Sequence, residues 1–200
     1  MLIEKILTDK EVQEVLNIIK KEEWTAGYTN AGKYHKDNKE LKNSKAAELV
    51  TNKIINCDIV KNYGFFKHML PVRFNWYEDS GKYANHVDFF QQEGIRTDWS
   101  MTLFLTNDYE GGELVVEDQE VKPEAGSLVL YNSGQIHRVN PVTKGKRIAA
   151  ISWAQSYIED AHERLIVARV GEAIKKVEGR DEETVNLSFV YSNLMRKWCA

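Results

Sequence analysis

The chain has 200 residues, of which 42% are hydrophobic and 28% are charged, and its formal net charge is −3. These values are typical of a globular domain and exclude global disorder and collagen-like repeats, while a small negative charge disfavours nonspecific nucleic-acid binding. The sequence contains no run of 18 apolar residues that would predict a membrane helix, and its charged N-terminus lacks the apolar segment of a signal peptide. We therefore expect a cytoplasmic protein, in the host cytoplasm if the chain is viral.

The N-terminal part is predicted to be helical. Thr8 and Glu11 have the spacing of a capping box, and the apolar residues that follow repeat with a helical period: Val12, Val15, Leu16 and Ile19. The Gly- and Asn-rich segment 25–38 is expected to be a loop. A second helix is predicted over 39–56, where one face carries Ala46, Ala47, Val50 and Ile54.

Residues 70–153 have a different character, because short runs rich in β-branched and aromatic residues alternate with turn residues. Eight strands are predicted, at 72–77, 84–88, 100–105, 113–117, 119–122, 127–131, 136–140 and 147–153. Strands of this length and spacing favour a sandwich or a jelly roll over a βαβ sheet.

The chain becomes helical again after the strands. Residues 159–177 form one predicted helix, and a second segment places an apolar stripe along one face: Leu187, Val190, Tyr191, Leu194 and Trp198. The two helices are expected either to form an αα-hairpin packed on the β core or to make a homodimer contact. We divide the chain into a main domain over 1–158 and a helical extension over 159–200.

Two predicted strands carry residues typical of a metal site. His86 and Asp88 form an H-x-D pair, and residues i and i+2 of a strand project from the same face. His137 belongs to another predicted strand and could complete a set of two imidazoles and one carboxylate. That set is the facial triad of non-haem Fe(II) oxygenases, which leaves coordination positions open. The alternative is an ordinary exposed histidine at a strand edge.

Arg147 follows His137 beyond a break at 143–145, which is suited to a three-residue hairpin loop. Such a hairpin would set Arg147 opposite Pro141 and on the same face as His137, roughly 13 Å away at ~3.3 Å per residue. A five-carbon diacid could bridge this gap, with one end on the metal and its far carboxylate on the guanidinium. The alternative is a surface arginine beside a turn.

Ordered matches to one known family extend over about 70–163, and 191–198 adds a similar C-terminal helix. They are Phe74-Asn75-Trp76-Tyr77, Asn85-His86-Val87-Asp88, Thr102-Leu103-Phe104-Leu105, Gly111-Gly112-Glu113-Leu114-Val115, the segment 125–131, His137-Arg138-Val139, Pro141-Val142-Thr143, the segment 145–147 and Trp153. Through these residues the chain resembles the PKHD-type hydroxylases, bacterial and phage relatives of the prolyl 4-hydroxylases.

The resemblance implies an α+β fold with a mainly β core, namely a double-stranded β-helix (jelly roll) that carries N-terminal helices and a C-terminal helical pair. It implies Fe(II), 2-oxoglutarate and O₂, and it extends the expectation to ascorbate. His86, Asp88 and His137 are then the catalytic iron ligands, Arg147 holds the tail carboxylate of 2-oxoglutarate, and Tyr77 donates a hydrogen bond to this co-substrate. Tyr77 could instead be a core aromatic residue, and Trp153 either walls the pocket or packs in the core.

The expected reaction is hydroxylation of a prolyl residue in a peptide or protein, with 2-oxoglutarate converted to succinate and CO₂. Two loops, 25–38 and 89–97, are expected to contact the substrate. Two alternatives stay open: the same chemistry on a small molecule or nucleobase, and a cupin-like metal-binding sensor without turnover. Arg147 disfavours the sensor, because a simple metal binder needs no anchor for a diacid.

Overall fold

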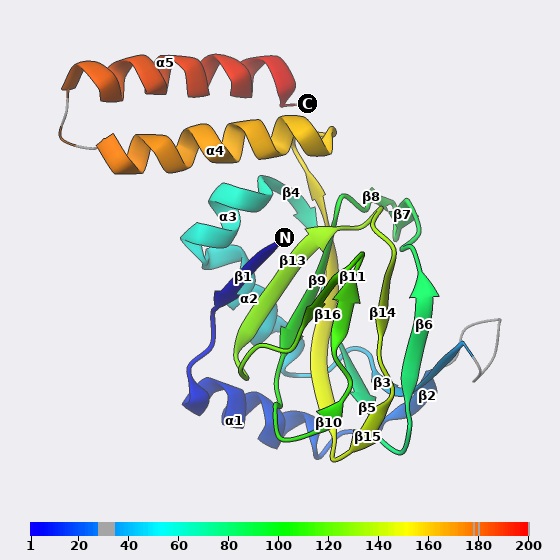
Figure 1. Cartoon of the computed structure of the whole chain (residues 1–200). Helices are drawn as coiled ribbons and strands as arrows, with labels where there is room; N and C mark the ends of the chain where they lie inside the picture. The colour runs from blue at the N-terminus through cyan, green and yellow to red at the C-terminus, as the bar shows by residue number, and fades with distance from the viewer. Residues whose placement is uncertain (28–34, 178, 180, 200) are drawn as a thin grey trace.

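The protein consists of two layers of antiparallel strands, with helices packed on the outer side of one layer (Figure 1). The computed structural model describes residues 1–27, 35–177, 179 and 181–199. The described residues form five helices: α1 (Asp9–Ile19), α2 (Ala47–Asn56), α3 (Asp58–Gly64), α4 (Ala161–Val177) and α5 (Asp181–Trp198). The strands are β1 (Leu2–Lys5), β2 (Thr25–Gly27), β3 (Lys36–Leu41), β4 (Phe66–Met69), β5 (Arg73–Tyr77), β6 (Lys82–His86), β7 (Gln91–Gln92), β8 (Ile95–Arg96), β9 (Trp99–Phe104), β10 (Glu110–Gly111), β11 (Leu114–Val116), β12 (Gln119–Val121), β13 (Ser127–Asn132), β14 (His137–Val139), β15 (Val142–Lys144) and β16 (Arg147–Ser156).

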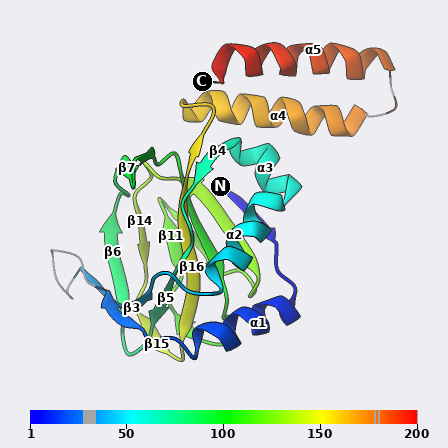
Figure 2. The same cartoon turned by 180° about the vertical axis from the view of Figure 1, so that it is seen from behind.

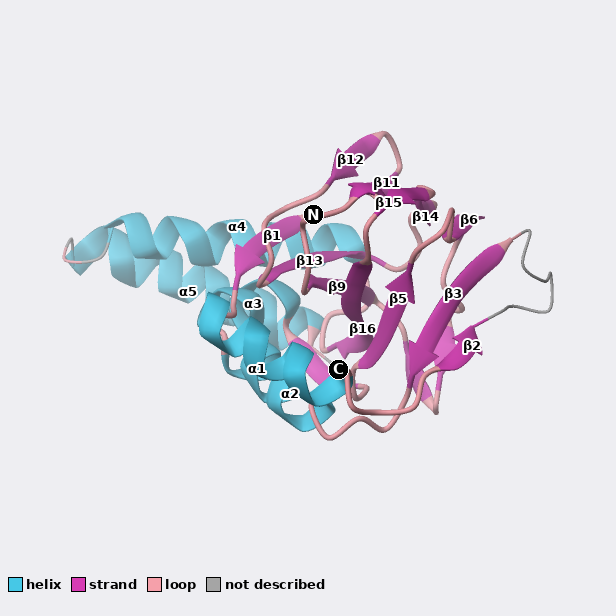
Figure 3. Ribbon diagram, turned by 90° about the horizontal axis from the view of Figure 1, so that it is seen from below, coloured by secondary structure: helices cyan, strands magenta, loops and turns pink. Residues whose placement is uncertain are grey.

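One curled sheet supplies both layers. Its strand order is β1-β13-β9-β16-β5-β3-β6-β14-β11-β12. The sheet passes from one layer to the other at β3, because one part of this strand pairs with β5 and the other part with β6. We call β1-β13-β9-β16-β5-β3 the major layer and β6-β14-β11-β12 the minor layer. Seen from below, the minor layer lies across from the major layer, and the helices cover the far side of the major layer (Figure 3). This arrangement confirms the predicted jelly roll.

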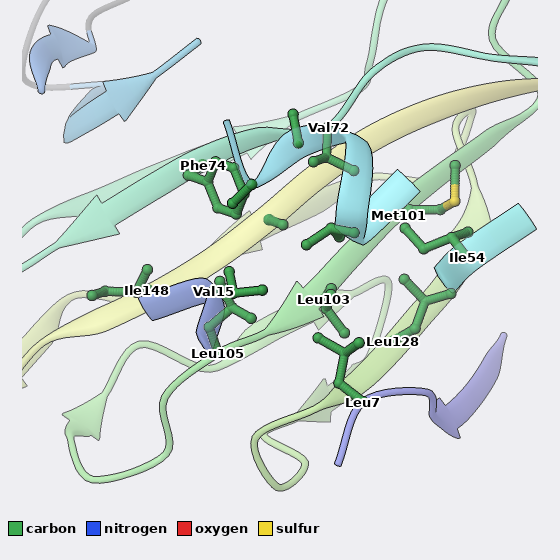
Figure 4. Packing of buried hydrophobic residues seen from close by; sticks show 14 of the residues in the cluster. Leu7, Val15, Ile54, Val72, Phe74, Met101, Leu103, Leu105, Leu128 and Ile148 are labelled. Carbon is green, nitrogen blue, oxygen red and sulfur yellow. The ribbon is translucent and has the colours of Figure 1, made fainter. Parts of the chain in front are cut away.

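Alternation of side chains along the major layer produces two different interiors. Leu103 of β9 and Ile148 of β16 point toward the helices and pack with Val15 of α1 and Ile54 of α2 in the main hydrophobic core (Figure 4). The helices α1, α2 and α3 lie against this face when the molecule is seen from behind (Figure 2). Residues of opposite parity on the same strands face the minor layer, since side chains alternate with a period of two. The space between the layers is therefore where polar side chains can gather.

The predicted capping box is present at the start of α1. Glu11 donates its backbone amide to Thr8 Oγ1 at 3.3 Å, and Thr8 donates its own to Glu11 Oε2 at 2.8 Å. The Glu11 carboxylate also forms an ion pair with Lys53 of α2, so this side chain connects the two helices. The Lys53 ammonium and the Thr8 donors lower the pKa of Glu11 to about 2.

We expect the stability contributed by Glu11 to depend on pH. Its pKa in the folded state lies below the ordinary value of 4.5, so the contribution is complete above about pH 5 and is lost as the pH falls toward 2. Glu11→Gln should destabilise the protein by about 0.5 kcal/mol at pH 7, the usual size of a partly exposed ion pair. Urea unfolding of both proteins at pH 7 and near pH 2 measures this difference, and Glu14→Gln on the same helix is the control. A difference that persists undiminished at pH 2 would contradict the prediction.

Two predictions for the N-terminal third are wrong. Part of the expected loop over 25–38 is β2 and the start of β3, while 28–34 lies outside the described residues. The helix predicted over 39–56 begins only at Ala47, because 39–41 belongs to β3. β3 was not predicted because its inward-facing residues are polar. Lys36 and Asn38 are buried, and Lys36 forms an ion pair with Glu40. A strand that buries charged and amide side chains lacks the apolar alternation by which strands are recognised.

The C-terminal helices form the predicted αα-hairpin. α4 packs on α3 through Val167 and Ala168, which share a small core with Phe65 and Ile158. α5 packs on α4 and has no buried residue of its own, so it forms the outermost layer of the molecule (Figure 1). No described helix is both long and apolar enough to cross a membrane. The division of the chain at residue 158 stays a prediction.

Candidate metal centre

Cross-strand pairing in the minor layer brings the predicted metal ligands together. His86 of β6 lies directly opposite His137 of β14, and their ring centroids are 4.1 Å apart. Asp88 follows just beyond the end of β6. The exposed Val87 between them points outward, so the side chains of His86 and Asp88 share the inner face, as the H-x-D spacing predicted.

The three side chains present their ligand atoms to one point. One such atom from each residue lies within 4.8 Å of the other two. Asp88 is at the centre, with Oδ1 3.9 Å from His86 Nε2 and Oδ2 3.5 Å from His137 Nε2. Each imidazole donates its Nδ1–H to a backbone carbonyl two residues earlier, Ala84 or Gln135, at 2.9 Å. These hydrogen bonds select the tautomer whose Nε2 lone pair is free for a metal ion.

The surroundings of His86 favour the neutral imidazole that a metal ion requires. Burial, assisted by the neighbouring His137, lowers the pKa of His86 to about 4. The His86 imidazole is therefore neutral at physiological pH, as a metal ligand must be. Ser100 of β9 donates its hydroxyl to Asp88 Oδ2 at 2.5 Å, and this bond from the major layer fixes the carboxylate.

Tyr83 supports His86 in a way that the sequence did not predict. Its ring stacks on the imidazole with centroids 3.5 Å apart and planes at 15°. Tyr83 stands three residues before His86, a spacing that in a regular strand puts two side chains on opposite faces. The register explains the contact: His137 and Val139 pair with His86 and Tyr83, so β6 contains one extra residue, a β-bulge. The sequence carries no signal for this bulge.

Arg147 reaches the same interior by a different route from the predicted one. It is the first residue of β16, which pairs with β5, and it lies opposite Tyr77. The expected hairpin between 136–140 and 147–153 is wrong, because β15 pairs with β10 and the chain crosses here from the minor to the major layer. The conclusion drawn from that hairpin nevertheless holds, since Arg147 and His137 line one cavity.

The Arg147 guanidinium is buried, and it forms no ion pair with any carboxylate that the structure describes. The residue is 1% exposed, and its Nε and Nη2 atoms have no hydrogen-bond partner among the described residues. The rings of Phe104 and Tyr77 flank it at 4.9 and 5.3 Å from the guanidinium carbon. Burying an unpaired charge is costly, and a carboxylate is the partner that a guanidinium binds in two-pronged geometry. This cavity is therefore built to receive an anion.

A single cavity between the layers connects the triad and Arg147. Tyr77 and Trp153 also line it, as expected for a pocket wall. Burial raises the pKa of Tyr77, so its phenol stays protonated and is able to donate a hydrogen bond. The remaining lining residues, none of which the sequence reasoning assigned to the site, are Asn75, Tyr83, Ser100, Met101, Thr102, Leu114, Tyr131, Val139, Ile151 and Ser152.

The residues present fit both Fe(II) and 2-oxoglutarate. Two neutral imidazole nitrogens and one carboxylate are the donor set of non-haem iron sites with open positions. The Arg147 guanidinium in the same cavity, with its Nε and Nη2 free of described partners, fits the second carboxylate of a dicarboxylic acid. His86, Asp88 and His137 would hold the metal ion, and Arg147 would hold the free end of the co-substrate.

Comparison with known proteins agrees with this geometry. Residues 72–155 match the family model of the 2OG-Fe(II) oxygenase superfamily. A PKHD-type hydroxylase from Aliarcobacter butzleri is 36% identical, over 98% of this chain and 97% of its own. The chain belongs to the PKHD-type hydroxylases. As a member of this family it is a 2-oxoglutarate- and Fe(II)-dependent oxygenase, and the resemblance seen in the sequence is confirmed.

Solved structures show that this PKHD-type chain shares the double-stranded β-helix. A Pseudomonas putida prolyl-4-hydroxylase matches with a TM-score of 0.63 at 20% identity, over 78% of this chain and 91% of that protein. A Trichoplax adhaerens prolyl hydroxylase, solved with a peptide fragment of the hypoxia inducible factor oxygen degradation domain, matches with a TM-score of 0.62 at 17% identity over 82% and 86%. At these identities the likeness concerns the fold.

Proposed function

We propose that this PKHD-type hydroxylase hydroxylates a prolyl residue within a peptide or protein. The observation that carries the oxygenase assignment in the structure is the buried Arg147, whose Nε and Nη2 have no hydrogen-bond partner among the described residues, in one cavity with a two-histidine, one-carboxylate cluster. When bound, iron and 2-oxoglutarate supply the oxidising chemistry, in which O₂ oxidises a C–H bond and 2-oxoglutarate leaves as succinate and CO₂. Ascorbate and a cytoplasmic location stay predictions.

The chain's own residues orient these groups. His86 and His137 are held by their Nδ1 hydrogen bonds, and Asp88 is held by Ser100, so the ligand atoms are fixed before a metal ion binds. Arg147 sits at the closed, fully buried part of the cavity, which orients a diacid with its keto-acid end toward the triad. Such preorganisation favours one pose of the co-substrate.

A rim of exposed apolar side chains beside the ligands supports a polypeptide substrate. Phe89 and Phe90 follow Asp88 directly and are 79% and 81% exposed, and the half-exposed Ile136 precedes His137. Thr97 fixes the backbone of this segment, because its amide donates to the Phe90 carbonyl at 3.0 Å and its hydroxyl donates to the Phe89 carbonyl. Aromatic rings held outward on a fixed backbone suit contact with proline-containing extended chains, which dock on aromatic surfaces. The relatives solved as prolyl hydroxylases, one of them with a peptide, point the same way.

We expect the rim to determine affinity for the peptide but not for the co-substrate. Phe89→Ser and Ile136→Ser should each raise the KM for a proline-containing peptide about five- to thirtyfold, since partly burying an apolar side chain is worth ~1–2 kcal/mol. The KM for 2-oxoglutarate should stay unchanged. Ile59→Ser, the same substitution at an exposed position of α3, is the matched control. Equal peptide kinetics in all three variants would contradict this role for the rim.

The proposed reaction is tested by mass spectrometry of proline-containing peptides after incubation with the enzyme, Fe(II), 2-oxoglutarate and ¹⁸O₂. We expect ¹⁸O incorporation at a prolyl residue together with succinate release. If succinate formed only in the presence of a small molecule or nucleobase, that compound and not a peptide would be the substrate. A protein that binds iron and releases no succinate with any substrate would be a sensor, and the proposed function would be wrong.

A further inference from the structure

In the part of the chain that the structure describes, one face of the outermost helix has no packing partner. α5 packs on α4 through Tyr191, Leu194 and Trp198, which lie on one side of the helix. The opposite side carries Val185 and Phe189, which are 66% and 69% exposed. Large apolar side chains exposed together on one helix face mark an interaction surface more often than chance exposure does.

The sequence of this outward face is symmetric about Phe189. Its exposed residues are separated by three, four, four and three positions: Glu182, Val185, Phe189, Asn193 and Arg196. Steps of three and four residues keep all of them on one stripe of a helix, opposite the stripe that contacts α4. The stripe begins with an acidic residue and ends with a basic one, at equal distances from its centre.

We propose that α5 pairs antiparallel with α5 of a second copy of this chain, about a two-fold axis through Phe189. A two-fold interface requires a patch that complements itself, and the stripe meets this requirement. Glu182 of each copy then lies opposite Arg196 of the other, and the two Phe189 rings meet at the centre. This juxtaposition rests only on the helix and its exposed residues, so it is independent of the proposed reaction.

The remaining pair combines an apolar residue with a polar one. Val185 faces Asn193 of the second copy, and the side-chain amide of Asn193 donates to the Phe189 carbonyl of its own helix at 2.8 Å. That bond satisfies one of the two amide hydrogens, so the second hydrogen and Oδ1 of Asn193 must face water at the edge of the interface. The two charge pairs at the ends fix the register, because sliding one helix by a turn separates both of them.

Sedimentation velocity over a range of protein concentrations tests the pairing. We expect a species of twice the 23.1 kDa chain mass, and its dissociation should increase with salt because the end pairs are exposed. Arg196→Glu or Glu182→Arg alone turns two attractive pairs into repulsive ones and should weaken the dimer by about tenfold. The double reversal, Glu182→Arg with Arg196→Glu, restores both pairs and should recover the wild-type dimer.

Two further variants distinguish this surface from any other. Phe189→Ser should yield a monomer, whereas Glu183→Arg, on a neighbouring stripe of the same helix, should remain dimeric. Circular dichroism checks that each variant keeps its helices, which is expected because every substituted residue is exposed. A wild-type chain that is monomeric at all concentrations overturns the proposal. So does a dimer that persists equally in Phe189→Ser and in the single charge reversals.

Discussion

Arg147→Ala should raise the 2-oxoglutarate requirement by on the order of 30-fold or more, since removing one member of a buried charge pair typically costs ~2–5 kcal/mol. The guanidinium is buried, and its Nε and Nη2 have no partner in the described part of the chain, so the co-substrate carboxylate would be its principal partner. Fe(II) binding should be nearly unchanged, because Arg147 belongs to the major layer and His86, Asp88 and His137 lie in the minor layer or just beyond its strand β6. Succinate release against 2-oxoglutarate concentration measures the effect.

Two comparisons separate this role from a structural one. Arg147→Lys should be intermediate, because an ammonium keeps the charge but loses the planar two-pronged contact. Pyruvate has no second carboxylate, so its weak binding should differ little between the wild type and Arg147→Ala. If Arg147→Ala abolished iron binding as well, or if all variants required the same 2-oxoglutarate concentration, Arg147 would not be the anchor.

Asp88→Ala should remove most iron binding. Asp88 lies between the two Nε2 atoms and is the one anionic member of the cluster, so its loss leaves two neutral ligands for a divalent cation. Changes to residues that merely orient metal ligands cost 10–100-fold in affinity, and loss of a ligand should cost about 100-fold or more. Anaerobic Fe(II) titration measures the affinity, and the charge-transfer band that 2-oxoglutarate produces on bound iron should disappear in parallel.

A matched control distinguishes ligand loss from unfolding. Asp118→Ala removes an exposed carboxylate near the turn between β11 and β12 and should leave the Fe(II) titration unchanged. Thermal unfolding of the metal-free Asp88→Ala protein should remain cooperative. Ordinary iron affinity in Asp88→Ala would show that the ligands have been assigned wrongly.

The predictable parts of the fold are those with apolar alternation or helical periodicity. All eight predicted strands appear with shifts of a few residues at their ends, as does the capped helix α1. β3 could not be recognised because it buries polar side chains, and β7, β8 and β10 are too short to show a pattern. Two-residue strands depend on their neighbours rather than on their own sequence.

In the site too, relations within one segment could be predicted from the sequence, whereas contacts between distant segments could not. H-x-D spacing places His86 and Asp88 on one side, since that relation is internal to one segment. Tyr83 was missed because a bulge changes its face, and Ser100 was missed because it comes from the opposite layer. Arg147 was assigned to the right cavity although the hairpin used to place it does not exist.

Because Arg147 and the triad lie on different layers, a bound co-substrate would link the two layers. The guanidinium is fixed on β16 of the major layer and the histidines on β6 and β14 of the minor layer, and among the described strands β3 is the one whose pairing joins the two layers. A diacid bound to the metal at one end and to Arg147 at the other would connect the two layers on the open side of this curled sheet. Any ligand that binds only the folded state adds to its stability, so the loaded enzyme should resist opening of the sheet that the empty enzyme permits.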